Sequence, residues 1–159
     1  MPYFVGYDGG GTKTECVLLE ATGHVLSQAT VGPSNPLRVG YEKAFAALAE
    51  AAARTLAPLE LRPGDVSVVG AGLAGAGRAD VAAHVRNYLT QHFVQAFVHV
   101  TSDLEIALEA TAGAGPGVVL IAGTGSAACG RNAGGQTARA GGHGPWVGDE
   151  GSAFDIGRQ

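Results

Sequence analysis

Residues 3–21 read YFVGYDGGGTKTECVLLEA, and this stretch decides the predicted fold. Its first part, Tyr3–Asp8, has the apolar composition of a short buried strand, and Thr14–Ala21 is a second run of apolar and β-branched residues. The glycine-rich turn Gly9–Lys13 joins the two runs. Thr22–His24 is another turn signal, and the strand-like run Val25–Val31 follows it. We therefore predict an antiparallel meander of three strands.

Strand-like and helix-like segments alternate after this meander, which two prolines end. The predicted strands are Val66–Ala71 and Phe97–Thr101, and the predicted helices are Tyr41–Leu56, Arg78–Phe93 and Leu104–Ala112. Strands that alternate with helices imply parallel pairing, which is added here to the antiparallel meander. The prediction is an α/β fold with a mixed five-stranded sheet, helices on its faces and the element order β-β-β-α-β-α-β-α.

The opening pattern begins again after Pro116. Strand-like runs alternate with glycine-containing turns, and a helix-like segment ends the chain: the strands are Val118–Ala122, Ala127–Arg131 and Thr137–Ala140, and the helix is Ser152–Arg158. We predict a first domain over residues 1–115 and the beginning of a second, truncated domain over residues 116–159. The chain is therefore interpreted as a fragment of a longer protein.

Charge, hydropathy and cysteine content exclude several classes of protein. The net charge of −4 argues against nucleic-acid binding, which would need a basic stripe. No apolar run is long enough to cross a membrane, and the N-terminus lacks the pattern of a signal peptide. Cys16 and Cys129 are expected to be buried, reduced thiols rather than a disulfide or a metal site. These features predict a cytoplasmic protein.

The first glycine cluster has the chemistry of a phosphate-binding turn. Gly10 and Gly11 let backbone N–H groups approach phosphate oxygens, Thr12 adds a hydroxyl donor, and Lys13 adds a positive charge. Asp8, at the end of the strand, is placed to hold Mg²⁺ through water. The spacing is neither that of a Walker A loop nor that of a dinucleotide fingerprint. A glycine-rich hairpin that binds no ligand stays open as the alternative.

A second turn of the same kind occupies the equivalent place in the restarted pattern. Gly123, Thr124 and Gly125 stand between two strands, and Ser126 follows them. Two such turns facing each other could hold a polyphosphate from both sides. The turns and Asp8 therefore predict a polyphosphate and Mg²⁺ as ligands.

Four segments together resemble one family: Asp8–Lys13, Thr101–Asp103, Leu120–Ser126 and Gly148–Ala153. They resemble the N-acetylglucosamine kinase group of the BadF/BadG/BcrA/BcrD ATPase family, within the actin, sugar-kinase and Hsp70 superfamily. The resemblance implies two ribonuclease-H-like domains that hold sugar and ATP, in proteins about twice as long as this chain. It also implies an ATP-dependent kinase that phosphorylates the 6-hydroxyl of N-acetylglucosamine or a related amino sugar. The present chain alone, without an adenosine segment, is then expected to be inactive.

The resemblance assigns the catalytic role to Asp103. The matching aspartate of the family is the base that takes the proton of the sugar hydroxyl, and it also contacts the sugar. A carboxylate within hydrogen-bond reach suffices to orient and deprotonate an alcohol. Asp103 also stands between a strand and a helix, where it could instead cap free N–H groups.

The other sugar contacts that the resemblance implies are Asn35, Ser126, Gly142, His143, Asp149 and Glu150. Asn35 before a proline is also an ordinary turn signal, and Asp149 with Glu150 could cap the last helix. His143 stands where relatives can have tryptophan, which leaves glucosamine or another hexose open as the substrate.

Two other functions stay open from the sequence. One is an ATPase that drives electron transfer, of the type that activates benzoyl-CoA reductase or 2-hydroxyacyl-CoA dehydratase; those proteins share an iron–sulfur cluster between cysteines of a dimer. The other is a sugar sensor that binds without phosphorylating. The sequence predicts a small-molecule partner and leaves a homodimer open.

Overall fold

A β-hairpin built around the first glycine turn starts the structure, which is a computed structural model describing residues 2–144 and 146–158. Strand β1 (Tyr3–Gly9) pairs antiparallel with β2 (Thr14–Glu20), and β2 pairs antiparallel with β3 (Val25–Val31). The predicted meander is thus confirmed. The chain divides into two compact units, Met1–Asp103 and Leu104–Gln159, which are described separately.

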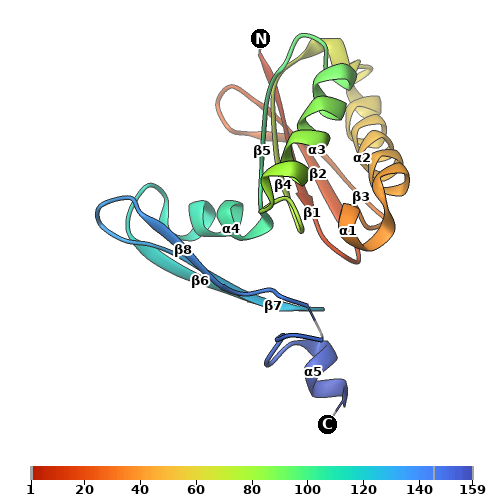
Figure 1. Cartoon of the computed structure of the whole chain (residues 1–159). Coiled ribbons are helices and arrows are strands. Elements are labelled where there is room, and N and C mark those ends of the chain that lie inside the picture. The colour runs from red at the N-terminus through yellow and green to blue at the C-terminus, as the bar shows by residue number, and fades with distance from the viewer. Residues whose placement is uncertain (1, 145, 159) are drawn as a thin grey trace. The chain divides into compact units, whose positions relative to one another are not determined.

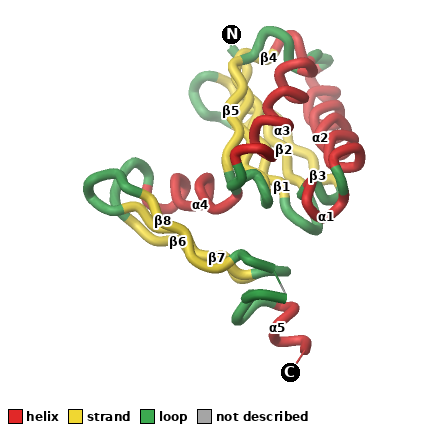
Figure 2. The backbone as a smooth tube through the Cα atoms, in the orientation of Figure 1, coloured by secondary structure: helices red, strands yellow, loops and turns green. Residues whose placement is uncertain are grey.

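The sheet of the first unit is mixed and five-stranded, with the order β3-β2-β1-β4-β5 (Figures 1 and 2). Strand β4 (Val66–Leu73) lies parallel to β1, and β5 (Phe97–Thr101) lies parallel to β4. The predicted mixed sheet is therefore confirmed. Because β1, β4 and β5 are parallel, their carboxyl ends meet at one edge of the sheet.

Two helices pack against this sheet, and the hydrophobic core lies between the helices and the sheet. Helix α2 (Tyr41–Leu56) packs on β2 and β3, helix α3 (Ala79–His92) packs on β5, and the two helices touch each other. Fully buried side chains include Leu18, Leu48, Leu56, Val69, Val85, Leu89 and Phe93. Burial of each such side chain contributes roughly 1.5–3 kcal/mol. Between the helices, the rings of Phe45 and Tyr88 stack with their centroids 4.1 Å apart.

Three short helical turns add to the predicted elements: α1 (Pro36–Val39), η1 (Ala57–Leu59) and η2 (Pro63–Asp65). Each contains a proline near its start, where the missing N–H costs nothing. None is long enough to show a helical period of apolar residues. Strand β4 also runs two residues beyond its predicted end, because Gly72 and Leu73 still pair with β1.

The second unit has an antiparallel sheet of its own with the order β6-β7-β8. Its elements are α4 (Asp103–Ala112), whose first residue is the last of the first unit, β6 (Gly117–Ala122), β7 (Ser126–Arg131), β8 (Thr137–Gly141) and α5 (Ala153–Arg158). The predicted repeat of strand, turn, strand, turn, strand is confirmed. Helix α4 supplies Leu104 and Leu108 to a small core that also contains Cys129. The predicted domain boundary after residue 115 stays a prediction.

Arg131 of β7 forms hydrogen bonds with the last part of α4 and with the turn that follows it. Nε of Arg131 donates to the Gly115 carbonyl oxygen at 3.0 Å, and Nη1 donates to the Glu109 carboxylate at 2.9 Å.

Among the described residues, no helix combines the length and apolar character that a membrane crossing requires.

Candidate functional site

The first glycine turn is held in place by backbone hydrogen bonds from both sides. The Gly10 amide donates to the Lys13 carbonyl oxygen at 2.8 Å and closes the turn between β1 and β2. The Gly10 carbonyl oxygen accepts from the amides of Ser34 and Asn35, each at 3.2 Å. The Gly9 carbonyl oxygen accepts from the Ala74 amide at 2.7 Å. The turn is thus fixed between the segments that follow β3 and β4.

Gly9 has no room for a side chain. A β-carbon at this position would lie 2.2 Å from Oγ of Ser34 and 2.3 Å from Cδ2 of Leu73. Both neighbours are fully buried. Oγ1 of Thr14 lies 2.8 Å from the Ser34 hydroxyl oxygen, which fixes that hydroxyl group further.

The three glycines of the turn therefore differ in what they leave for a ligand. The Gly10 amide is engaged inside the turn, so its predicted phosphate contact stays a prediction. The Gly11 amide has no hydrogen-bond partner among residues 2–144 and 146–158. Thr12 and Lys13 are exposed at the tip, and the Lys13 ammonium group pairs with the Glu15 carboxylate.

Asp8 and Asp103 come from the ends of parallel strands, which is why they share an edge of the sheet. Asp8 lies near the end of β1, and Asp103 follows β5 as the first residue of α4. Partial desolvation raises the pKa of Asp8, and the negative charges of Glu15 and Asp103 raise it further; Lys13 opposes them. Such mutual repulsion between carboxylates is relieved when a cation binds.

This edge can hold Mg²⁺ only with help from water or substrate oxygens. The described residues contain no group of three or more His, Cys, Asp or Glu side chains that could bind a metal ion directly. Mg²⁺ keeps several waters and is typically held by one or two carboxylates plus phosphate oxygens. Asp8 fits that role.

Asp103 lies within the first turn of α4. A negative charge at this end of a helix is stabilised by the helix dipole, so the alternative structural role is compatible with a catalytic one. Its half-buried carboxylate is also the negative charge from the β5 end that acts on Asp8.

Asn35 has the turn role that its sequence context indicates. It is the N-cap residue of α1, and its Oδ1 accepts from the Leu37 amide at 3.0 Å. A β-carbon at Gly75 would lie 2.9 Å from this oxygen, so the side chain is closely surrounded. The amide nitrogen of Asn35 has no hydrogen-bond partner among the described residues, and a sugar hydroxyl could accept from it.

In the second unit, three of the predicted sugar contacts form hydrogen bonds with Ser126. The Ser126 amide donates to Oδ1 of Asp149 at 3.3 Å, and its hydroxyl group donates to the Glu150 carbonyl oxygen at 2.8 Å. The Gly142 amide donates to the Ser126 carbonyl oxygen at 2.8 Å. The Asp149 carboxylate also covers Gly125, where a β-carbon would lie 3.1 Å from Oδ2.

The turn Gly123–Ser126 is closed by its own backbone and by α5. The Gly123 amide donates to the Gly125 carbonyl oxygen at 2.9 Å, and the Gly123 carbonyl oxygen accepts from the Ala153 amide at 2.8 Å. Thr124 is exposed at the tip of this turn, and His143 is exposed after β8. Their roles toward phosphate and sugar stay predictions.

The cap of α5 is Ser152 rather than either predicted acid. Oγ of Ser152 accepts from the Asp155 amide at 3.1 Å, and Oδ2 of Asp155 accepts from the Gly151 amide at 2.9 Å. This reciprocal pattern resembles a capping box. The Asp149 side chain is instead directed to Ser126.

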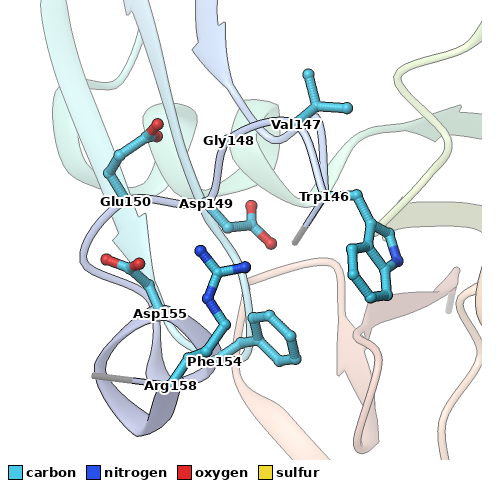
Figure 3. Close-up of a pocket in the computed structure, with 8 residues that line it drawn as sticks. All are labelled: Trp146, Val147, Gly148, Asp149, Glu150, Phe154, Asp155 and Arg158. Carbon is cyan, nitrogen blue, oxygen red and sulfur yellow. The ribbon is translucent and has the colours of Figure 1, made fainter.

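A shallow cavity of about 150 Å³ lies beside these residues. It is lined by Trp146, Val147, Gly148, Asp149, Glu150, Phe154, Asp155 and Arg158 (Figure 3). The sequence did not predict Phe154, Asp155 or Arg158 as site residues, because each fits an ordinary amphipathic helix end. The Arg158 guanidinium carbon lies 6.0 Å from the centre of the Phe154 ring, in the range of a cation–π contact.

Both cysteines are buried and free, as predicted. Burial raises the pKa of the Cys16 thiol to about 11. A buried, protonated thiol is a poor metal ligand, so Cys16 does not suit an iron–sulfur cluster shared between subunits.

Comparison with known proteins agrees with the motifs. An N-acetylmuramic acid/N-acetylglucosamine kinase from Clostridium acetobutylicum is 35% identical over 157 residues, which is 99% of this chain and 51% of that protein. An N-acetyl-D-glucosamine kinase from Dictyostelium discoideum is 33% identical, over 97% of this chain and 51% of its own length. A solved structure from Chromobacterium violaceum, provisionally assigned as an N-acetylglucosamine kinase, is 28% identical with a TM-score of 0.74, covering 96% of this chain and 53% of that one.

The chain spans about half the length of the curated relatives it matches. The model of the BadF/BadG/BcrA/BcrD ATPase family matches residues 5–159, almost the whole chain. The motifs at both glycine turns lie inside this match. The chain therefore belongs to the BadF/BadG/BcrA/BcrD ATPase family.

Proposed function

We propose that the protein to which this chain belongs is an ATP-dependent sugar kinase acting on the 6-hydroxyl of N-acetylglucosamine or a related amino sugar. The observation that carries the proposal is the edge where Asp8, the first glycine turn and Asp103 come together at the ends of parallel strands. The relatives named as kinases of N-acetylglucosamine and N-acetylmuramic acid support the substrate class.

In the proposed reaction, Asp103 accepts the proton of the sugar hydroxyl as its oxygen attacks the terminal phosphorus of ATP. The bond between that phosphorus and the bridging oxygen breaks, and ADP leaves with the electron pair. The protein's task in such a transfer is positioning and charge neutralisation. Asp8 would hold Mg²⁺ through water, and the ion would supply part of that neutralisation.

The other residues orient the reactants. The Gly11 amide is a donor for a phosphate oxygen in the first unit. Nδ2 of Asn35 is a donor for a sugar hydroxyl, and the Asp149 and Glu150 carboxylates are acceptors. A small-molecule sugar is thus the proposed partner; a cytoplasmic location and a homodimer stay predictions.

The test is a coupled ADP-release assay on the complete gene product with N-acetylglucosamine, N-acetylmuramic acid, glucosamine and glucose. Loss of a general base typically costs 100-fold or more, so we expect Asp103→Asn to lower turnover by about that factor. Its affinity for the sugar should stay within a few-fold. Glu42→Gln is the control, because Glu42 is exposed on α2 and has no ion pair among the described residues.

Near-normal turnover of Asp103→Asn would contradict the assignment of the base. Sugar binding without ADP release in the folded wild-type protein would instead favour the sensor. ATP hydrolysis that no sugar stimulates, in a protein that contains iron, would favour the electron-transfer ATPase.

A further inference from the structure

Arg38 is an exposed cation that the proposed reaction has not used. It lies on α1, the short helix that begins after Asn35. Arg38 has no ion pair within the described part of the chain. Some other basic side chains of the first unit do have one: Arg54 pairs with Glu50, and Arg78 pairs with Asp80.

The fold fixes the start of α1 against the first glycine turn. The Gly10 carbonyl oxygen accepts from the amides of both Ser34 and Asn35, the two residues that precede the helix. The Arg38 amide in turn donates to the Asn35 carbonyl oxygen at 3.0 Å. The backbone from which the Arg38 side chain starts is therefore tied to the turn by hydrogen bonds.

The Arg38 side chain lies against Gly11. A β-carbon at Gly11 would lie 2.9 Å from Nη1, 3.4 Å from Cδ and 3.9 Å from Cζ of Arg38. The guanidinium group therefore sits directly beside a residue of the turn whose amide lacks a partner within residues 2–144 and 146–158. Two kinds of donor, a charged fork and a backbone N–H, are thus brought together.

The charge balance of the turn explains why such a cation matters. Asp8, Glu15 and Asp103 place negative charge at this edge, and the ammonium group of Lys13 is already paired with Glu15. A polyphosphate that approaches Gly11 would meet net repulsion from these carboxylates. Arg38 supplies a positive charge that no described carboxylate has neutralised.

We propose that the Arg38 guanidinium and the Gly11 N–H form one anion subsite, which takes the terminal phosphate of the nucleotide. The planar guanidinium presents parallel N–H donors that match two oxygens of one phosphate. This role rests on the proposed function only in naming the nucleotide as the source of the phosphate. A carboxylate carried by an acidic amino sugar has similar chemistry, and the experiment separates the two sources.

The test compares Arg38→Gln and Arg38→Lys with a matched control, Arg86→Gln. Arg86 is an exposed arginine on α3 without an ion pair in the described residues. Titration calorimetry with inorganic pyrophosphate, without sugar, measures the anion subsite directly. Steady-state assays then give KM for ATP with N-acetylglucosamine, and KM for N-acetylglucosamine and N-acetylmuramic acid.

We expect Arg38→Gln to weaken pyrophosphate binding about tenfold and to raise KM for ATP by a similar factor, with either sugar. Arg38→Lys should fall between the wild type and Arg38→Gln, because it keeps the charge but loses the planar fork. Arg86→Gln should leave all these values unchanged. Thermal unfolding of each variant is measured to confirm that the fold is intact. Substitution of an exposed side chain should change the stability little.

Unchanged pyrophosphate binding in a folded Arg38→Gln protein would overturn the proposal. A defect confined to KM for N-acetylmuramic acid would also overturn it, because the guanidinium group would then serve the sugar carboxylate. Pyrophosphate binding requires neither sugar nor turnover. If the wild-type protein has no kinase activity but binds pyrophosphate, and Arg38→Gln weakens that binding, the proposed function is wrong and the anion subsite is supported.

Discussion

Replacement of Gly9 by alanine should destabilise the first unit strongly. The new β-carbon would lie 2.2 Å from Oγ of Ser34 and 2.3 Å from Cδ2 of Leu73, far inside contact distance. Both neighbours are 0% exposed and cannot turn away into solvent. Overpacking a core costs about 1–3 kcal/mol, and disturbing the buried Ser34–Thr14 hydrogen bond adds about 1 kcal/mol. We expect a loss of about 2–4 kcal/mol in the free energy of unfolding.

Urea unfolding followed by circular dichroism measures this loss. A loss of this size should lower Tm by roughly 5–15 °C for a chain of this length. Gly10→Ala is the matched control, because the nearest atom to its β-carbon is the Lys13 carbonyl oxygen at 3.4 Å, an ordinary contact. Neither glycine has a positive φ, so backbone strain does not distinguish them.

The reasoning would be refuted if Gly9→Ala unfolded at the same urea concentration as the wild type. It would also be refuted if Gly10→Ala were destabilised as much as Gly9→Ala. A general intolerance of side chains in the turn, rather than the two specific contacts, would then be the cause.

Two further predictions follow from the perturbed side chains. Because desolvation and the charges of Glu15 and Asp103 raise the pKa of Asp8, its ionised form opposes folding, and Asp8→Asn should raise Tm at pH 7 in the absence of Mg²⁺ and ATP. The difference in Tm should vanish as the pH falls below the ordinary carboxyl pKa, where Asp8 is protonated in both the folded and the unfolded state. A gain in Tm over the wild type that is smaller at pH 7 than at pH 3 would contradict this. With a pKa of about 11, Cys16 is a thiolate in about one molecule in a thousand at pH 8, so it should react with a disulfide reagent only after unfolding in urea. Rapid labelling of Cys16 in the folded protein, with Cys129→Ser as the background, would show that its burial is wrong.

The bounds of helices and strands could be predicted from local sequence where apolar residues recur at regular spacing and a residue that ends the element follows. Helix α2 matches its prediction, Tyr41–Leu56, because its apolar positions recur at helical spacing and Pro58 follows it. Strands β3 and β5 also have their predicted bounds. The parallel pairing of β4 and β5 follows from their alternation with helices.

The candidate site could be predicted only where a residue with suitable chemistry stands at the end of a predicted strand. Asp8 and Asp103 stand at strand ends, and the topology brings parallel strand ends to one edge. Arg38 gave no such signal, because helix α1 is a single turn and its position depends on hydrogen bonds that the Ser34 and Asn35 amides donate to the distant Gly10 carbonyl oxygen. The choice between Ser152 and Asp149 as the cap of α5 depends likewise on where Ser126 lies, which the sequence of the loop does not specify.

The three consecutive glycines of the first turn have three different roles in the structure. Gly9 is small because Ser34 and Leu73 fill the space around it. Gly10 uses both of its backbone groups to close the turn and to hold the segment that leads to α1. Gly11 alone keeps an amide without a partner in the described chain, beside the guanidinium group of Arg38. A substitution in this run should therefore affect stability at Gly9, and at Gly11 it should affect the anion binding that we propose for its amide and Arg38.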